Sequence, residues 1–140
     1  MIALLVMFLT ALPQAPVPPV RSLDKGAMSR IETARQVSAS TAEQLAALWK
    51  GHGSSRPQPA VDFSKEIVVA VFMGTQSTAG YATEIVGYRN ASPGSKDVIV
   101  QYRETAPSRD AITAQILTSP YHIAVIPKQT GAVTFERVKS

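Results

Sequence analysis

The sequence predicts an α+β, β-rich protein: an antiparallel sheet or sandwich of about six to seven strands, with one N-terminal helix packed on it. Ten prolines and eight glycines divide the 140 residues into many turns. Short apolar or alternating segments recur between those turns, which is typical of strands. One segment, residues 40–51, instead carries apolar residues at helical spacing. Strands therefore dominate the expected architecture.

The first twenty residues differ in composition from the rest. "MIALLVMFLTALPQAPVPPV" has no charged side chain, and Ile2–Leu12 is an eleven-residue apolar stretch interrupted only by Thr10. That length suits the apolar part of a signal peptide and falls short of the ~20 residues of a membrane-spanning helix. We expect residues 1–20 to direct export to the periplasm or outside the cell, with a mature chain beginning between Ala11 and Arg21. The alternative is an anchor formed by residues 2–12, which would be the protein's one membrane contact.

Residues 21–140 are long enough for a single β-rich domain with one core. The chain has no cysteine, which excludes a disulfide, a thiol nucleophile and a thiolate metal site. The stretches "APVPPV" and "RSLDKGA", residues 15–27, predict an extended, mobile linker, because proline fixes φ and cannot donate to a sheet.

The first regular elements follow the linker. Residues 31–37 alternate weakly, which indicates a strand with one solvated side. Ser40 and Glu43 have capping-box spacing at the start of the helix, and Gly51 is placed to end it. Trp49 shares a helix face with leucines, so we interpret it as a core residue.

Six further strands are predicted from short segments bounded by turn residues. They are "KEIVVAVFM" (65–73), "YATEIVGY" (81–88), "DVIVQYRET" (97–105), "AITAQIL" (111–117), "YHIAVIP" (121–127) and "AVTFERV" (132–138). The first has no alternation and is expected to be a central strand covered on both faces. The residues expected in the core are Ile67, Val69, Val71, Val98, Val100 and Phe135.

The chemistry-bearing residues do not form a catalytic or metal-binding pattern. His52 lies near Ser54 and Ser55 on a glycine-rich loop, which does not preorganise them, and His122 in a strand is typical of a hydrogen-bonded structural histidine. The ten carboxylates are dispersed, and nucleotide-binding loops are absent. The net charge of +4 comes without basic clusters. We expect no enzyme activity, no cofactor, no metal and no nucleic-acid partner.

Several ordered motifs carry a family resemblance. "AVDFSKEIVVAVFMGTQSTAGYATEI", "YRETAPSRDAITAQILTSPYHIAVIPK" and "VTF" resemble the C-terminal domain of the protease-complex subunit PrcB family, over residues 60–140. The matching motifs fall on Val61–Phe63, Gly74–Tyr81, Ala106–Pro107 and Gln115–His122. The sequence departs from the family at Ala79, which replaces the first glycine of a usual pair.

The resemblance implies a function in protein binding. The founding member of the family is a non-catalytic accessory subunit of an exported serine-protease complex. We therefore expect a monomeric, exported domain that acts as an accessory or scaffolding subunit, with a protein partner that is an exported protease or an envelope complex. A looser similarity, to the Asn-Pro-Thr-Thr-Gly-Tyr loop of chagasin-type inhibitors of cysteine proteases, retains Thr78, Gly80 and Tyr81 and gives the alternative: a loop-presenting inhibitor.

Two turns are the predicted binding site. "GTQSTAGY" (74–81) is longer than the about two residues a hairpin needs, and "SPYH" (119–122) joins two expected strands. Tyr81 would anchor the first turn, and Tyr121 and His122 would lie near the rim as interface anchors. The alternatives are a tolerated long hairpin and residues that plug the end of the sheet. The candidate partner-binding residues are Gly74, Gln76, Ser77, Thr78, Gly80, Tyr81, Pro120, Tyr121 and His122.

Overall fold

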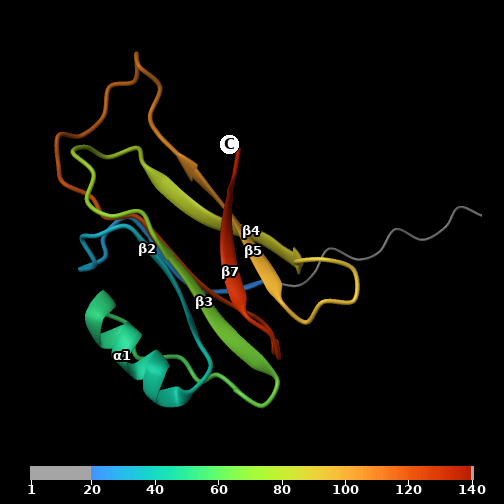
Figure 1. Ribbon diagram of the computed structural model, residues 1–140. Helices are drawn as coiled ribbons and strands as arrows, with labels where there is room; N and C mark the ends of the chain where they lie inside the picture. The colour runs from blue at the N-terminus through green and yellow to red at the C-terminus, as the bar shows by residue number, and fades with distance from the viewer. Residues whose placement is uncertain (1–19, 140) are drawn as a thin grey trace, which may run out of the picture.

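The computed structural model describes residues 20–139, which form seven strands and one helix (Figure 1). The elements are β1 (Arg21–Gly26), β2 (Arg35–Ala39), α1 (Ala42–His52), β3 (Glu66–Phe72), β4 (Ala82–Asn90), β5 (Val98–Thr105), β6 (Tyr121–Pro127) and β7 (Val133–Val138). The predicted export segment lies outside the described residues, except for Val20. Within the described part of the chain, no helix is long and apolar enough to cross a membrane. The β-rich α+β prediction is confirmed.

The strands form two sheets. One has the order β1-β6-β3-β2 and is antiparallel throughout; the other has the order β4-β5-β7. In the second sheet β5 is antiparallel to β4 but parallel to β7, a departure from the antiparallel pattern expected. The two sheets and α1 make three layers, with the β1-β6-β3-β2 sheet in the middle (Figure 1).

The central strand β3 explains this layering. Val68, Ala70 and Phe72 pack with α1, whereas Ile67, Val69 and Val71 pack against the second sheet. Successive side chains of a strand point to opposite faces, so a strand covered on both faces is apolar at every position. The predicted core residues Ile67, Val69, Val71, Val98 and Val100 are buried, and Phe135 is half-buried against them.

The helix begins and ends later than predicted. Thr41 caps it by accepting a hydrogen bond from the Gln44 N–H (3.2 Å), and the Gln44 side chain accepts one from the Ser40 N–H (2.8 Å). Gly53, at φ 72°, ends it. The assignment to Ser40, Glu43 and Gly51 was therefore wrong. A second capping-box pair, Thr41 and Gln44, lies one residue further along, and Gly53 rather than Gly51 adopts the left-handed conformation that ends the helix.

Trp49 is confirmed as a core residue. Its side chain is buried with Leu45 and Leu48, and its indole N–H donates to the Arg56 carbonyl (3.0 Å).

Three predicted segments differ from the structure. Residues 21–26 are not a linker but β1, an edge strand that pairs with β6 along one side. The early strand is shifted to Arg35–Ala39. Residues 111–117 form no strand: they lie within a long loop, residues 106–120, in which Ile112 and Ile116 face solvent. An alternating pattern indicates that a segment can form a strand, but it does not show whether a neighbouring strand is there to pair with it.

Candidate functional site

Two long loops lie side by side at one end of the molecule (Figure 1). They are residues 74–81, between β3 and β4, and residues 106–120, between β5 and β6; together we call them the paired loops. Gln76 and Thr118 exchange both main-chain hydrogen bonds (2.7 and 3.0 Å), and the Ala79 N–H donates to the Ala114 carbonyl (3.0 Å). The Thr118 hydroxyl donates to the Thr78 carbonyl (2.8 Å). The long 74–81 turn therefore holds the 106–120 loop in place through these hydrogen bonds.

Gly80 lies close against the 106–120 loop. Its φ is 96°, and a Cβ at this position would meet the side chains of Pro107 and Thr113. No residue other than glycine has a positive φ in the described chain, so Ala79 fits its place without a left-handed backbone. The departure from the family pattern at Ala79 thus leaves this part of the loop intact.

A third segment extends this end of the molecule. The Ser119 N–H donates to the Ala27 carbonyl (2.7 Å), and the Ser29 N–H donates to the Ser119 carbonyl (3.0 Å). These bonds place Met28 beside Ser119, at the end of the middle sheet.

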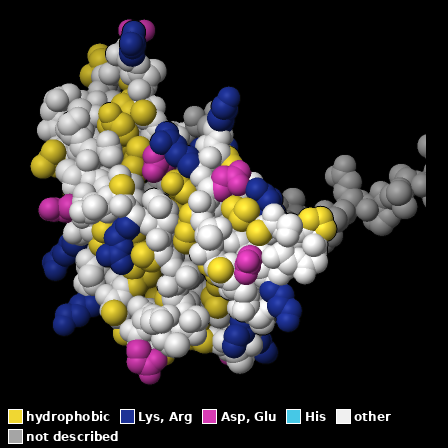
Figure 2. Space-filling view, in the orientation of Figure 1, with side chains coloured by type: hydrophobic (Ala, Val, Ile, Leu, Met, Phe, Trp, Pro, Cys, Tyr) yellow, Lys and Arg dark blue, Asp and Glu magenta, His cyan; other side chains and the backbone are white. Residues whose placement is uncertain are grey.

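Exposed apolar side chains gather at this end. Within residues 20–139, the large hydrophobic side chains that face solvent are Met28 (66% exposed), Ile112 (102%), Ile116 (52%) and Leu117 (67%). Three belong to the 106–120 loop, and Met28 is paired to its end. Figure 2 shows hydrophobic side chains over this loop at the upper left. We call these four residues the apolar loop surface.

The structure brings the predicted binding residues to the same end but does not expose all of them. Ser77 and Gly80 are exposed, while Gln76, Thr78 and Tyr81 are half-buried. Pro120, Tyr121 and His122 are buried, so the rim position expected for the last two side chains was wrong. These residues enter β6 and face inward. The apolar loop surface was missed because residues 111–117 were expected to form a strand and Met28 was assigned to no element.

His122 has a structural role, as predicted from its position in a strand. Its Nδ1 accepts the Ile85 N–H (2.9 Å), which puts the ring proton on Nε2, and Nε2–H then donates to the Ser22 hydroxyl (2.9 Å). Burial, with a smaller contribution from Lys25, lowers the pKa of His122 to about 4. The ring is therefore neutral at pH 7 and joins the two sheets.

A second polar cluster is buried beneath α1. Asp24 Oδ2 accepts from His52 Nε2 and from the Ser54 hydroxyl, both at 3.2 Å, and His52 Nδ1 lies 2.9 Å from the Ser29 hydroxyl. Burial raises the pKa of Asp24, but hydrogen bonds from His52, Tyr121 and Ser54 outweigh it and hold the pKa below its usual value. The Asp24 carboxylate is therefore ionised at neutral pH.

This cluster has the residue types of a hydrolase relay but not its accessibility. His52 is 1% exposed, its ring packs against Tyr121 with centroids 4.1 Å apart, and the Ser29 hydroxyl also accepts the Ile31 N–H (3.1 Å). A reacting group must reach its substrate, so the geometry suits a buried link between β1, α1 and β6. In residues 20–139, no three histidine or carboxylate side chains gather as metal ligands.

The fold and this surface define a small, three-layer, β-rich domain with an apolar patch on its loops. Residues 67–127 match the family described as PrcB C-terminal, which confirms the predicted resemblance. The match begins in β3, ends with β6 and includes both paired loops. The family name denotes an accessory domain of a protease complex, not a catalytic one. Comparison with curated proteins and with solved structures gave no match.

Proposed function

We propose that this protein is an exported, non-catalytic accessory or scaffolding subunit that binds a protein of a protease or envelope complex through its apolar loop surface. The observation that carries the proposal is the gathering of Met28, Ile112, Ile116 and Leu117 on one end of the domain. Solvation of these side chains is unfavourable in the free protein, and a partner that covers them gains their burial.

The support beneath the surface also suits binding. Thr118 is buried and hydrogen-bonded to both Gln76 and Thr78, so the 106–120 loop is held at its base. Loops positioned by a rigid scaffold commonly carry binding residues. The family match spans this whole unit, which supports the assignment to a protease-associated complex.

A loop-presenting protease inhibitor is the second candidate. The exposed Ser77 at the tip of the 74–81 turn supports it. Thr78 and Tyr81, which the chagasin-like pattern retains, are half-buried against the domain and favour the accessory role. Inhibition of papain by the wild-type protein, lost in a Ser77→Trp variant, would support the inhibitor instead.

Affinity capture with matched variants tests the accessory role. The full chain, tagged and expressed in its own cells, is recovered from envelope extract, and co-purified proteins are quantified by mass spectrometry. We expect recovery of one partner to fall at least about tenfold with Ile112→Asp plus Leu117→Asp, because a charged side chain at either position opposes burial against the partner. Ala46→Asp, on the exposed face of α1, is the control and should retain the partner. Equal recovery with the loop variant, at an unchanged melting temperature, would contradict the proposal.

A further inference from the structure

The strand β2 is an edge of the middle sheet. Within residues 20–139, β3 is the one strand that pairs with β2, so alternate residues of Arg35–Ala39 direct their N–H and C=O groups away from the sheet. No other main-chain group in that part of the chain bonds to them. An exposed edge of this kind can accept an added strand from another chain.

The other edge strands are less suited to such pairing. β1 and β4 carry register shifts, which distort an edge, and Glu136 and Arg137 place charges along β7. β2 pairs with β3 without a register shift and contains one charged residue, Arg35. Its unpaired edge is therefore regular enough to extend the sheet.

A groove of about 380 Å³ lies between β2 and α1. Its lining is largely apolar and includes Ile31, Val37, Ala47, Leu48 and Gly51. The α1 residues Ala47 and Gly51 are small, and a Cβ at Gly51 would meet nothing within 4 Å. The groove therefore has room for the side chains of a strand added to β2.

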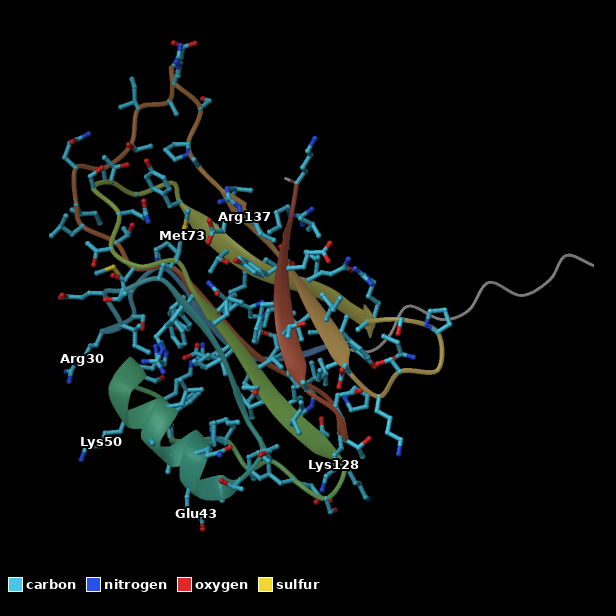
Figure 3. All side chains as sticks on the ribbon, viewed as in Figure 1. Arg30, Glu43, Lys50, Met73, Lys128 and Arg137 are labelled. Carbon is cyan, nitrogen blue, oxygen red and sulfur yellow. The ribbon has the colours of Figure 1, made fainter. Side chains whose placement is uncertain are left out.

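Arg35 gives the groove a positively charged end. Its side chain lines the groove, is exposed and forms no ion pair within residues 20–139. Arg30 and Lys50 lie at the end of α1 opposite Glu43, where they offset the negative end of the helix dipole (Figure 3). Arg35 belongs to β2 and has no such role, so its charge is available to an acidic group of an added strand.

We propose that β2 binds an extended segment of another protein as an antiparallel fifth strand of the middle sheet, with apolar side chains in the groove and an acidic side chain beside Arg35. Arg35, Val37 and Ala39 share the face of β2 toward α1. In antiparallel pairing, the residue opposite Ala39 comes first and the residue opposite Arg35 comes last. The recognised segment therefore has the pattern apolar-x-apolar-x-acidic.

Titration of the full chain with the capped peptide Ser-Val-Thr-Val-Thr-Glu-Ser tests the groove directly. Fluorescence anisotropy of the labelled peptide measures affinity, and we expect saturable binding that slows the hydrogen exchange of β2 amides. Replacement of the peptide's Glu by Lys should weaken binding about threefold, because opposite charges on paired strands attract and like charges repel. No saturable binding, or binding that leaves the exchange of β2 unchanged, would overturn the proposal.

Variants of Arg35 and of α1 identify the groups responsible. Arg35→Glu should reverse the preference, so that the Lys peptide binds more tightly than the Glu peptide. Ala47→Trp should fill the groove and weaken binding of both peptides at least about tenfold. Ala46→Trp is the matched control, since Ala46 is exposed on α1 but does not line the groove. An unchanged preference in Arg35→Glu, or equal binding by the two Trp variants, would overturn the proposal.

A second copy of this chain is the competing occupant of the edge. Sedimentation decides between the two: a wild-type dimer that becomes a monomer with Ala47→Trp would overturn the peptide proposal, and a monomeric wild type supports it.

Peptide binding by β2 goes beyond the proposed function and does not rest on it. Ile112→Asp plus Leu117→Asp should bind the peptide as the wild type does, because neither residue lines the groove. Loss of peptide binding in this variant, at an unchanged melting temperature, would overturn the β2 site, whereas capture of the partner in envelope extract tests the apolar loop surface alone.

Discussion

At the scale of single residues, two buried polar side chains account for two irregularities in the strands. In β1 the register of pairing with β6 shifts between Ser22 and Asp24, directly before the buried Asp24 side chain. In β4 the register shifts between Ile85 and Gly87, at the place where the Ile85 N–H bonds to His122 and not to a neighbouring strand. An extra residue in a strand re-aims the groups around it. Each bulge therefore supplies a polar contact that a regular strand would lack.

The buried His122 should make stability depend on pH. Its pKa is about 4 in the folded protein and 6.5 in the unfolded chain. Between these values the unfolded chain binds a proton that the folded protein does not, so the free energy of unfolding should fall as pH decreases from 6.5 toward 4, by up to about 3 kcal/mol. Urea unfolding at half-unit pH steps measures the slope.

The variant His122→Gln is the matched comparison. Its amide oxygen can accept the Ile85 N–H, but it does not titrate, so the part of the slope that His122 causes should vanish. Equal slopes in the wild type and His122→Gln would show that folding does not lower the pKa of this histidine.

At the scale of elements, the paired loops depend on close contact at Gly80. We expect Gly80→Ala to lower the free energy of unfolding by about 1–3 kcal/mol, because the φ of 96° is strained for alanine and its Cβ would meet Pro107 and Thr113. Gly87→Ala is the control: its Cβ meets nothing within 4 Å, and its effect should stay within about 0.5 kcal/mol. Thermal and urea unfolding compare the two. A loss at Gly80 no greater than at Gly87 would show that the loops separate readily.

The elements also show what the sequence could predict. β3 and β6 were identified because both faces are buried and every side chain is selected for the core. β1 was missed because an edge strand with Asp24 and Lys25 has the composition of a linker, and its pairing depends on residues distant in the chain. The segment 111–117 was misassigned because its alternating apolar residues give the same pattern whether the segment pairs with a neighbouring strand or lies in solvent. The apolar loop surface could not be predicted from the sequence, since it depends on which segments lie side by side in space.

At the scale of the whole molecule, β1 completes the middle layer. It covers one edge of β6, and Leu23 packs against the core beneath α1. Removal of residues 1–19 should leave the melting temperature within a few degrees, because β1 begins at Arg21. Removal of residues 1–26 also deletes Asp24 and should lower the melting temperature by roughly ten degrees or more, since about 1 kcal/mol corresponds to ~4 °C in a domain of this size. Circular dichroism of the two truncated proteins measures the difference, and similar melting would show that β1 is dispensable.

The pairing of the first strand with a late one also sets an order of events in folding. Ser22 and His122 bond across 100 residues of chain, and within residues 20–139 β6 is the one strand that pairs with β1. A chain that emerges from a ribosome or a translocation pore with its N-terminus first must therefore keep β1 unpaired until β6 has followed. Long-range pairing of this kind slows folding because a large loop must close first. The delay leaves β1 without its partner strand until most of the chain has been synthesised.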